Sequence, residues 1–210
     1  MPTTGDRSPG PPGDRGGRPA ATTPRALAAA AQRLFVEHGF EAVSVEDVTA
    51  AAGVSRRTFF RYFATKADVL WVESPAELAR LQALLAGTPS TPDYRPALVA
   101  AVLAALDHRD AQWARHRAQL VLTVPAVQAH AAVVYAQWRS AAGSWAARCS
   151  GDPADGLVPL AVGHATLAGI HTAHEHWIAR PDSALPDVLR SALGLALPPP
   201  AAPGDDPPAG

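Results

Sequence analysis

The sequence contains a single cysteine, Cys149, and no apolar run of the length that crosses a membrane. One thiol cannot form a disulfide within the chain, and it agrees with a reducing compartment. A membrane-spanning helix needs about 18 or more consecutive apolar residues, and the polar segment after Met1 does not resemble a signal peptide. We therefore expect a soluble protein of the cytoplasm, without a membrane partner.

The sequence also lacks an excess of either charge. Its 18 basic and 19 acidic residues give a formal net charge of −1, which argues against a protein that coats a polyanion. The basic residues are nevertheless unevenly spread, because residues 53–66 hold four cations and no acid: Arg56, Arg57, Arg61 and Lys66. From residue 71 onward, nine arginines oppose twelve acidic residues. This pattern predicts one small basic contact surface on a neutral-to-acidic body.

Regular structure is not expected at either end. Residues 1–22 and 198–210 are rich in Gly and Pro without apolar periodicity, so both are predicted to be disordered tails. The arginines of the first tail could lie in a DNA minor groove, or that tail could have no role. Between the tails, apolar residues recur at intervals of three and four, which predicts an all-α fold. The expected helices lie near 24–38, 45–51 and 56–62, then one opening at Thr65, then 74–86, 95–107, 110–122, 125–149, 157–179 and 184–197.

Residues 44–55 carry the signals of two short helices joined by a tight turn. Ser44 and Asp47 form a capping-box pattern at the start of the first helix, and Ser55 is the expected cap of the second. Gly53 lies in the turn, and two short helices joined by a glycine-containing turn are typical of a helix-turn-helix. We predict a three-helix, DNA-binding helix-turn-helix domain over residues 23–70 and a helical ligand-binding and dimerisation domain over 71–197.

The second short helix, 56–62, divides into two faces. At about 100° per residue, Phe59 and Phe63 face the small core, and Phe60 lies at the border. The opposite face presents side chains that can donate to phosphates or base edges, namely Arg57, Thr58, Arg61 and Tyr62. Lys66 adds a point charge, and Ser44 adds a hydroxyl beside free backbone N–H groups. The alternative is a three-helix unit with an ordinary charged surface.

Residues 27–70 resemble the N-terminal domain of the TetR family of bacterial regulators. The resemblance lies in Gly39-Phe40, Ser44-Val45, Ala51-Ala52-Gly53-Val54-Ser55, Thr58-Phe59, Tyr62-Phe63 and Lys66. It implies that phosphates are contacted from the positions of Ser44, Thr58 and Lys66. It implies contacts to bases or nearby backbone from the positions of Arg56, Arg57 and Tyr62. Phe60 departs from the family, which usually places a tyrosine there, so the phosphate contact of that hydroxyl should be missing.

The C-terminal part resembles a narrower group, the regulators found with mycofactocin biosynthesis genes in actinobacteria. The similar segments are VPAVQAHAAVVYAQWRSA and LAVGHATLAGIHTAHEHWIARPDSALPDVL. The resemblance implies control of genes of mycofactocin-linked redox metabolism. It also implies a large apolar effector such as a long-chain acyl-CoA.

Two sets of residues are candidates for an effector pocket. On the long helix, Tyr135, Trp138, Ala142 and Trp145 share one face, which can be either core or pocket lining, and Trp113 is a further candidate. On the 157–179 helix, His164, His171 and His174 lie on a mostly apolar face. They can be packing histidines, or polar contacts to a ligand or a dimer partner. A metal site is disfavoured because His164 and His171 are about 10 Å apart along the helix axis and two ligands do not close a site. We expect neither metal nor cofactor.

These observations together predict a homodimeric, ligand-responsive repressor of a palindromic operator in double-stranded DNA. The resemblance implies that the last two helices pair with those of a second copy, and small residues there allow close approach: Ala161, Gly163, Ala165, Ala168 and Gly169. Ligand binding would shift the dimer toward a spacing of the two DNA-reading helices that does not fit the operator. One rival is a helical metal-dependent enzyme using the histidines of 164–176. Another is a module that binds protein through its helix-turn-helix.

Overall fold

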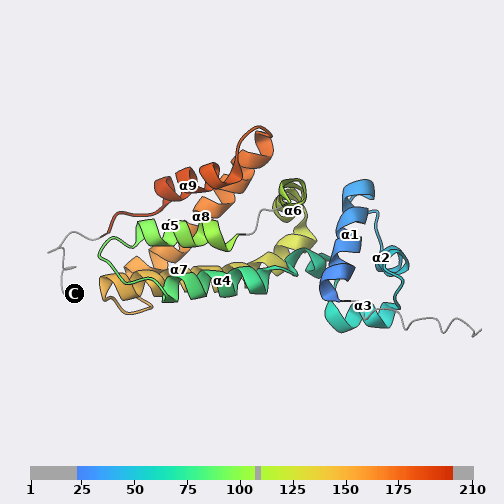
Figure 1. The fold of residues 1–210 in the computed structure, drawn as a ribbon, viewed down its shortest axis with the longest axis horizontal. Coiled ribbons are helices and arrows are strands. Elements are labelled where there is room, and N and C mark those ends of the chain that lie inside the picture. Colours follow the sequence, from blue (N-terminus) through green and yellow to red (C-terminus); the bar gives the residue numbers. More distant parts are fainter. Residues whose placement is uncertain (1–22, 107–109, 201–210) are drawn as a thin grey trace, which may run out of the picture.

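The computed structural model describes residues 23–106 and 110–200, and every regular element in these ranges is a helix (Figure 1). The prediction of an all-α fold is confirmed. The predicted disordered tails lie outside the described residues, apart from 198–200, and so does the end of the expected 95–107 helix. The elements are α1 (Pro24–His38), α2 (Val45–Ala51), α3 (Arg56–Tyr62), η1 (Lys66–Trp71), α4 (Ser74–Ala86), α5 (Arg95–Ala105), α6 (Ala111–Thr123), α7 (Pro125–Ser150), α8 (Leu157–Ala179) and α9 (Leu185–Ala196).

One expected element differs in kind. The helix expected to open at Thr65 is the short 3₁₀ helix η1, although its capping box with Asp68 is present. Pro75 stands at the start of α4 and has no N–H to continue a helical ladder from the preceding turn. Only a few residues are therefore left for η1, and such short segments commonly adopt the tighter 3₁₀ form.

The first three helices and η1 enclose a small core at one end of the molecule (Figure 1). Its largest fully buried side chains are Leu27, Phe35, Val48, Phe59 and Leu70. The turn between α2 and α3 needs a glycine because Gly53 has φ +64°, a conformation that L side chains rarely adopt. Gly39 after α1 also has positive φ, at +85°.

This core continues onto the C-terminal helices. Four buried residues of α6 and α7 belong to the same cluster as the side chains of the helix-turn-helix: Leu120, Val121, Val127 and Ala131. A second cluster is formed by α4, α5, α7, α8 and α9 and includes Leu81, Leu98, Trp145, Trp177 and Leu189. The two ends of the molecule are thus connected through packed apolar side chains along α6 and α7.

Two glycines of α8 are required by close packing within the chain. A Cβ on Gly163 would lie 2.6 Å from the carbonyl oxygen of Arg139 in α7, and one on Gly169 would lie 2.8 Å from Leu193 in α9. We expected these small residues to allow close approach between two copies of the chain. The structure instead uses both glycines inside one chain, while Ala161 and Ala168 are exposed.

Among the described residues, no single helix combines the length and apolar character of a membrane span. The helices α6 and α7, which meet at a bend of 101°, pass that test only when they are taken together.

Replacing Gly163 by Ala should destabilise the fold. The new methyl group meets the backbone carbonyl of Arg139 as well as its Cγ. Because backbone cannot swing aside, α7 and α8 must separate, and overpacking of this kind costs roughly 1–3 kcal/mol. Gly194→Ala in α9 is the matched control, because nothing lies within 4 Å of its Cβ position. Alanine there should stabilise the helix by roughly 0.5–1 kcal/mol. Urea unfolding measures both, and equal midpoints for the two variants would contradict this packing.

Candidate functional site

The helix α3 presents a polar face to solvent at the end of the molecule. Phe59 and Phe63 are buried, as predicted, while Arg57 and Arg61 are exposed and Thr58 is half-buried. The helix begins where the side chain of Ser55 accepts a hydrogen bond from the Thr58 N–H at 3.1 Å. A short, capped helix with an apolar inner face therefore holds the basic outer face in a fixed orientation.

The cations of this face differ in the ion pairs and hydrogen bonds that their side chains form with neighbouring residues. Arg56 forms an ion pair with Glu46 of α2 and lies over the Phe60 ring at 5.1 Å, so it ties the two short helices together. Arg61 donates to the Tyr62 hydroxyl at 2.6 Å. Among the described residues, Arg57 has no ion pair or hydrogen bond through its side chain. Arg57 is therefore a cation of this face that no described residue of the protein binds.

The N-terminus of α2 already holds a carboxylate. The backbone N–H and the hydroxyl of Ser44 both donate to Asp47 Oδ2, at 2.8 and 2.6 Å. These hydrogen bonds hold the pKa of Asp47 below its usual value. Two of the donors at Ser44 that we expected to be available to a phosphate are thus engaged, and a phosphate must approach beside a carboxylate.

Lys66 donates inward as well. Its ammonium nitrogen lies 2.6 Å from the Phe40 carbonyl oxygen, 2.9 Å from that of Val43 and 3.5 Å from that of Glu41. It also lies 4.4 Å from the centre of the Phe40 ring. Lys66 therefore fixes the loop between α1 and α2. The sequence predicted Lys66 as a phosphate contact and did not indicate that it binds this loop.

A cavity of about 90 Å³ lies in the C-terminal part, lined mainly by α4, α6, α7 and α8. Its wall includes Trp71, the last residue of η1, and Leu106, which follows α5. The helices contribute Ser74 and Glu77 (α4), Ala114, Arg117, Ala118, Val121 and Leu122 (α6), Val134, Tyr135 and Trp138 (α7), and Leu167, Ile170, His171 and His174 (α8).

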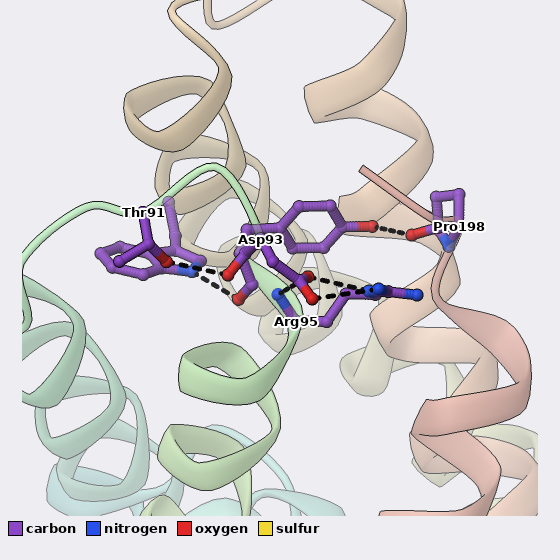
Figure 2. Close-up of polar contacts among 6 residues, drawn as sticks. Thr91, Asp93, Arg95 and Pro198 are labelled. Atoms are coloured by element: carbon purple, nitrogen blue, oxygen red, sulfur yellow. Dashed lines mark hydrogen bonds and ion pairs between the residues drawn. The ribbon is translucent and has the colours of Figure 1, made fainter. Parts of the chain in front are cut away.

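Half of the pocket candidates chosen from the sequence line this cavity: Tyr135, Trp138, His171 and His174. Ala142 and Trp145 are fully buried in the core instead. The Trp145 indole N–H donates to the Tyr94 carbonyl at 3.0 Å, in a polar cluster where the Pro198 carbonyl accepts from the Tyr94 hydroxyl (Figure 2). Trp113 packs against His116 and the helix-turn-helix core, and His164 is exposed.

An ion pair in the cavity wall joins the buried Glu77 to the half-buried Arg117. Arg117 donates to Glu77 at 3.1 Å and to the Ser74 hydroxyl at 3.2 Å, and its guanidinium lies 5.4 Å from the centre of the Trp71 ring. No signal in the sequence indicated that Glu77 and Arg117 form a pair in this cavity, because they are 40 residues apart and belong to separate helices. Their opposite charges compensate one another inside the wall.

Burial shifts the pKa of two further groups in the wall away from its usual value. It raises the pKa of Tyr135 to about 12, with Arg117 opposing the shift. It lowers the pKa of His171, against the opposing charge of Glu175. The two rings meet edge to face with centroids 4.7 Å apart. Both groups are therefore neutral at pH 7.

The histidines of α8 do not converge on one point. His164 is exposed, and His174 Nδ1 lies 2.8 Å from the Ile170 carbonyl oxygen of its own helix. Within 23–106 and 110–200, no group of three His, Cys, Asp or Glu residues could hold a metal ion. The arrangement favours packing and polar contacts over a metal-dependent reaction.

Known proteins share both parts of the chain. A model of bacterial regulatory proteins of the TetR family matches residues 27–70, and a model of the MftR C-terminal domain matches residues 92–198. The chain is 37% identical over 183 residues to the mycofactocin biosynthesis transcriptional regulator MftR of Mycobacterium tuberculosis, covering 86% of this chain and 92% of that protein. It is 41% identical over 69 residues to the HTH-type transcriptional regulator EthR of Mycolicibacterium smegmatis, covering 32% of each.

Solved structures share the fold. The repressor SmeT of the Stenotrophomonas maltophilia efflux pump SmeDEF superposes with a TM-score of 0.64 at 19% identity, covering 84% of this chain and 89% of that one. The Thermus thermophilus repressor FadR, in complex with lauroyl-CoA, gives 0.59 at 22% identity, covering 90% and 100%.

The matched families and the relatives consist of transcriptional regulators, so this chain is a DNA-binding transcriptional regulator and not an enzyme. The resemblance to TetR regulators that residues 27–70 suggested is confirmed. The chain belongs to the TetR family of bacterial regulatory proteins and carries a C-terminal domain of the MftR type.

Proposed function

We propose that the protein is a homodimeric repressor of the cytoplasm that releases a palindromic operator when an apolar effector occupies the cavity. The observation that carries this proposal is the position of Trp71, which lines the cavity and also ends the last helix of the DNA-binding part. A ligand that displaces this wall must move η1. The helix-turn-helix packed against η1 then moves with it.

The junction has the contacts that such coupling needs. The Asp68 carboxylate of η1 lies 2.9 Å from His130 Nδ1 of α7. The same carboxylate accepts a hydrogen bond from the Thr65 N–H at the start of η1. The His130 ring stacks on the Trp71 ring with centroids 6.0 Å apart. The Tyr135 ring meets the Trp71 ring edge to face, with centroids 6.1 Å apart. Two sites are coupled when both bias the same two-state element. We assign that role to η1.

A dimer would read the operator with two recognition helices. Such half-sites lie one helical turn apart, about 34–36 Å, or multiples of it. The helices α8 and α9 offer exposed apolar side chains for the pairing, because Leu157 is 84% exposed, Leu160 47% and Leu195 89%. Exposed apolar side chains on adjoining helices are typical of an interaction surface.

The effector and the target genes are proposed from the relatives. Similarity to the mycofactocin regulator supports control of mycofactocin-linked genes. The lauroyl-CoA complex of FadR and the apolar wall of the cavity support a long-chain acyl-CoA. The cavity of about 90 Å³ is below the roughly 300–1,000 Å³ of sites for larger ligands. A long chain must therefore separate the surrounding helices, as an effector that changes the protein's shape would do.

Replacing Arg57 by Ala should weaken operator binding and relax base preference at one position of each half-site. A bidentate contact to a base is worth roughly 1–3 kcal/mol of discrimination. Arg57 is a cleaner target than Lys66, whose loss would release the α1–α2 loop. Fluorescence anisotropy with the protein's own upstream DNA measures the effect, with the exposed Arg180 replaced by Ala as control. Equal affinity and base preference in the two variants would refute the assignment of α3 as the reading helix.

Release of operator DNA should depend steeply on acyl chain length. Each buried methylene contributes about 0.8 kcal/mol, so lauroyl-CoA should dissociate the complex at concentrations where acetyl-CoA has no effect. Ala114→Leu places extra carbons in the cavity wall and should abolish the response while DNA binding persists. Ala111→Leu, exposed on the same helix, should respond as the original protein does. Release that does not vary with chain length would rule out a long acyl chain as the effector.

A further inference from the structure

Among the residues that the structure describes, two polar atoms of the cavity wall are buried and have no hydrogen-bond partner. They are the indole nitrogen Nε1 of Trp71 and the imidazole nitrogen Nε2 of His171. Trp71 is only 6% exposed, and its N–H can act only as a donor. Leaving a buried donor unpaired costs about 1–3 kcal/mol, and native proteins retain few such groups. These two nitrogens can therefore form hydrogen bonds to a ligand in the cavity.

The charges of the cavity are already balanced. Arg117 is held by Glu77 and Ser74, and His171 is neutral because of its burial. A ligand carboxylate would lie among groups that include the Glu77 carboxylate, and a ligand cation would lie among groups that include the Arg117 guanidinium. Since burying an unpaired charge is strongly unfavourable, this wall favours an uncharged ligand group.

The remaining wall selects by size and apolar character. Its apolar surface comes from Val121, Trp138, Leu167 and Ile170. The volume of about 90 Å³ fits a compact molecule or one compact part of a larger ligand. A single oxygen on such a molecule would satisfy the Trp71 donor without adding charge.

We propose that this cavity binds a compact, neutral carbonyl group whose oxygen accepts a hydrogen bond from Trp71 Nε1, with His171 Nε2 as a second polar contact. The proposal rests on the proposed function only for the role of the cavity as an effector site. It names the chemistry that the cavity recognises, which the acyl-chain argument does not.

The position of Trp71 connects this hydrogen bond to the DNA-reading end. Trp71 ends η1 and Lys66 begins it, and Lys66 Nζ holds the carbonyls of the loop that leads to Ser44 and α2. A ligand oxygen that draws the indole toward the cavity would therefore act on the anchor of the helix-turn-helix through one short helix.

The test uses three probes that share a five-membered ring. Cyclopentanone carries a carbonyl, cyclopentane carries no polar group and cyclopentanecarboxylate carries a charged carboxylate. The protein is the full chain without DNA, and the readout is the indole N–H resonance of Trp71 in ¹H–¹⁵N spectra. That resonance is identified by its loss in Trp71→Phe or, should this variant not fold, by elimination with Phe variants of the other four tryptophans. Cyclopentanone should move the Trp71 indole proton downfield and bind more tightly than the other two probes.

The contribution of the donor is measured by substitution. Trp71→Phe keeps an aromatic ring against His130 but removes the N–H together with part of the indole ring. Cyclopentane reports the effect of the lost ring surface, so the dissociation constant for cyclopentanone should rise roughly 2- to 12-fold relative to that for cyclopentane. Trp113→Phe is the matched control, because Trp113 lies outside the cavity wall, and its affinity should be unchanged. An unmoved Trp71 resonance, equal binding of cyclopentane, or tighter binding of the carboxylate would overturn the proposal.

The same probes separate this proposal from the proposed function. Binding of cyclopentanone as described, without any change in operator affinity, would uphold the chemistry of the cavity and contradict its coupling to DNA. Release of the operator by lauroyl-CoA, with no binding of cyclopentanone, would uphold the repressor and overturn the carbonyl site.

Discussion

The burial of one indole, that of Trp71, is the constraint on which the arrangement of this protein depends. Trp71 belongs to the short helix that closes the DNA-binding unit, yet three residues of the C-terminal helices surround its ring: Arg117, His130 and Tyr135. The same ring lines the cavity. Because packed interiors respond to displacement by switching between discrete arrangements, we propose that a change at this ring is transmitted to both halves of the molecule.

Much of the DNA-binding unit could be predicted because its signals are local. The capping box of Ser44 and Asp47, the positive φ of Gly53 and the cap of Ser55 each lie within a few residues of the element that they define. The inner face of α3 follows from helical periodicity alone. The anchoring role of Lys66 had no such signal, because its carbonyl partners lie 23–26 residues earlier in the chain. A lone lysine in a basic segment suggests a solvent-exposed charge.

The cavity could be predicted only in part. Periodicity placed Tyr135, Trp138 and Trp145 on one face of α7, but it gives no information about which neighbour covers each turn of that face. Trp145 is covered by the start of α5, where the Tyr94 carbonyl accepts its N–H, and it belongs to the core. Tyr135 lies almost three turns away, beside α8 and Trp71, and it lines the cavity. Which of the two is core and which is pocket depends on long-range packing.

The central claim is that occupation of the cavity changes the relation between the two recognition helices of a dimer. The direct measurement is the distance between spin labels on the two copies, placed at Arg33→Cys, exposed on α1 and outside the α3 face, in a Cys149→Ser background and read by double electron–electron resonance. Lauroyl-CoA should shift the distance distribution away from the one that operator DNA selects. An unchanged distribution in protein to which lauroyl-CoA is demonstrably bound would contradict the claim.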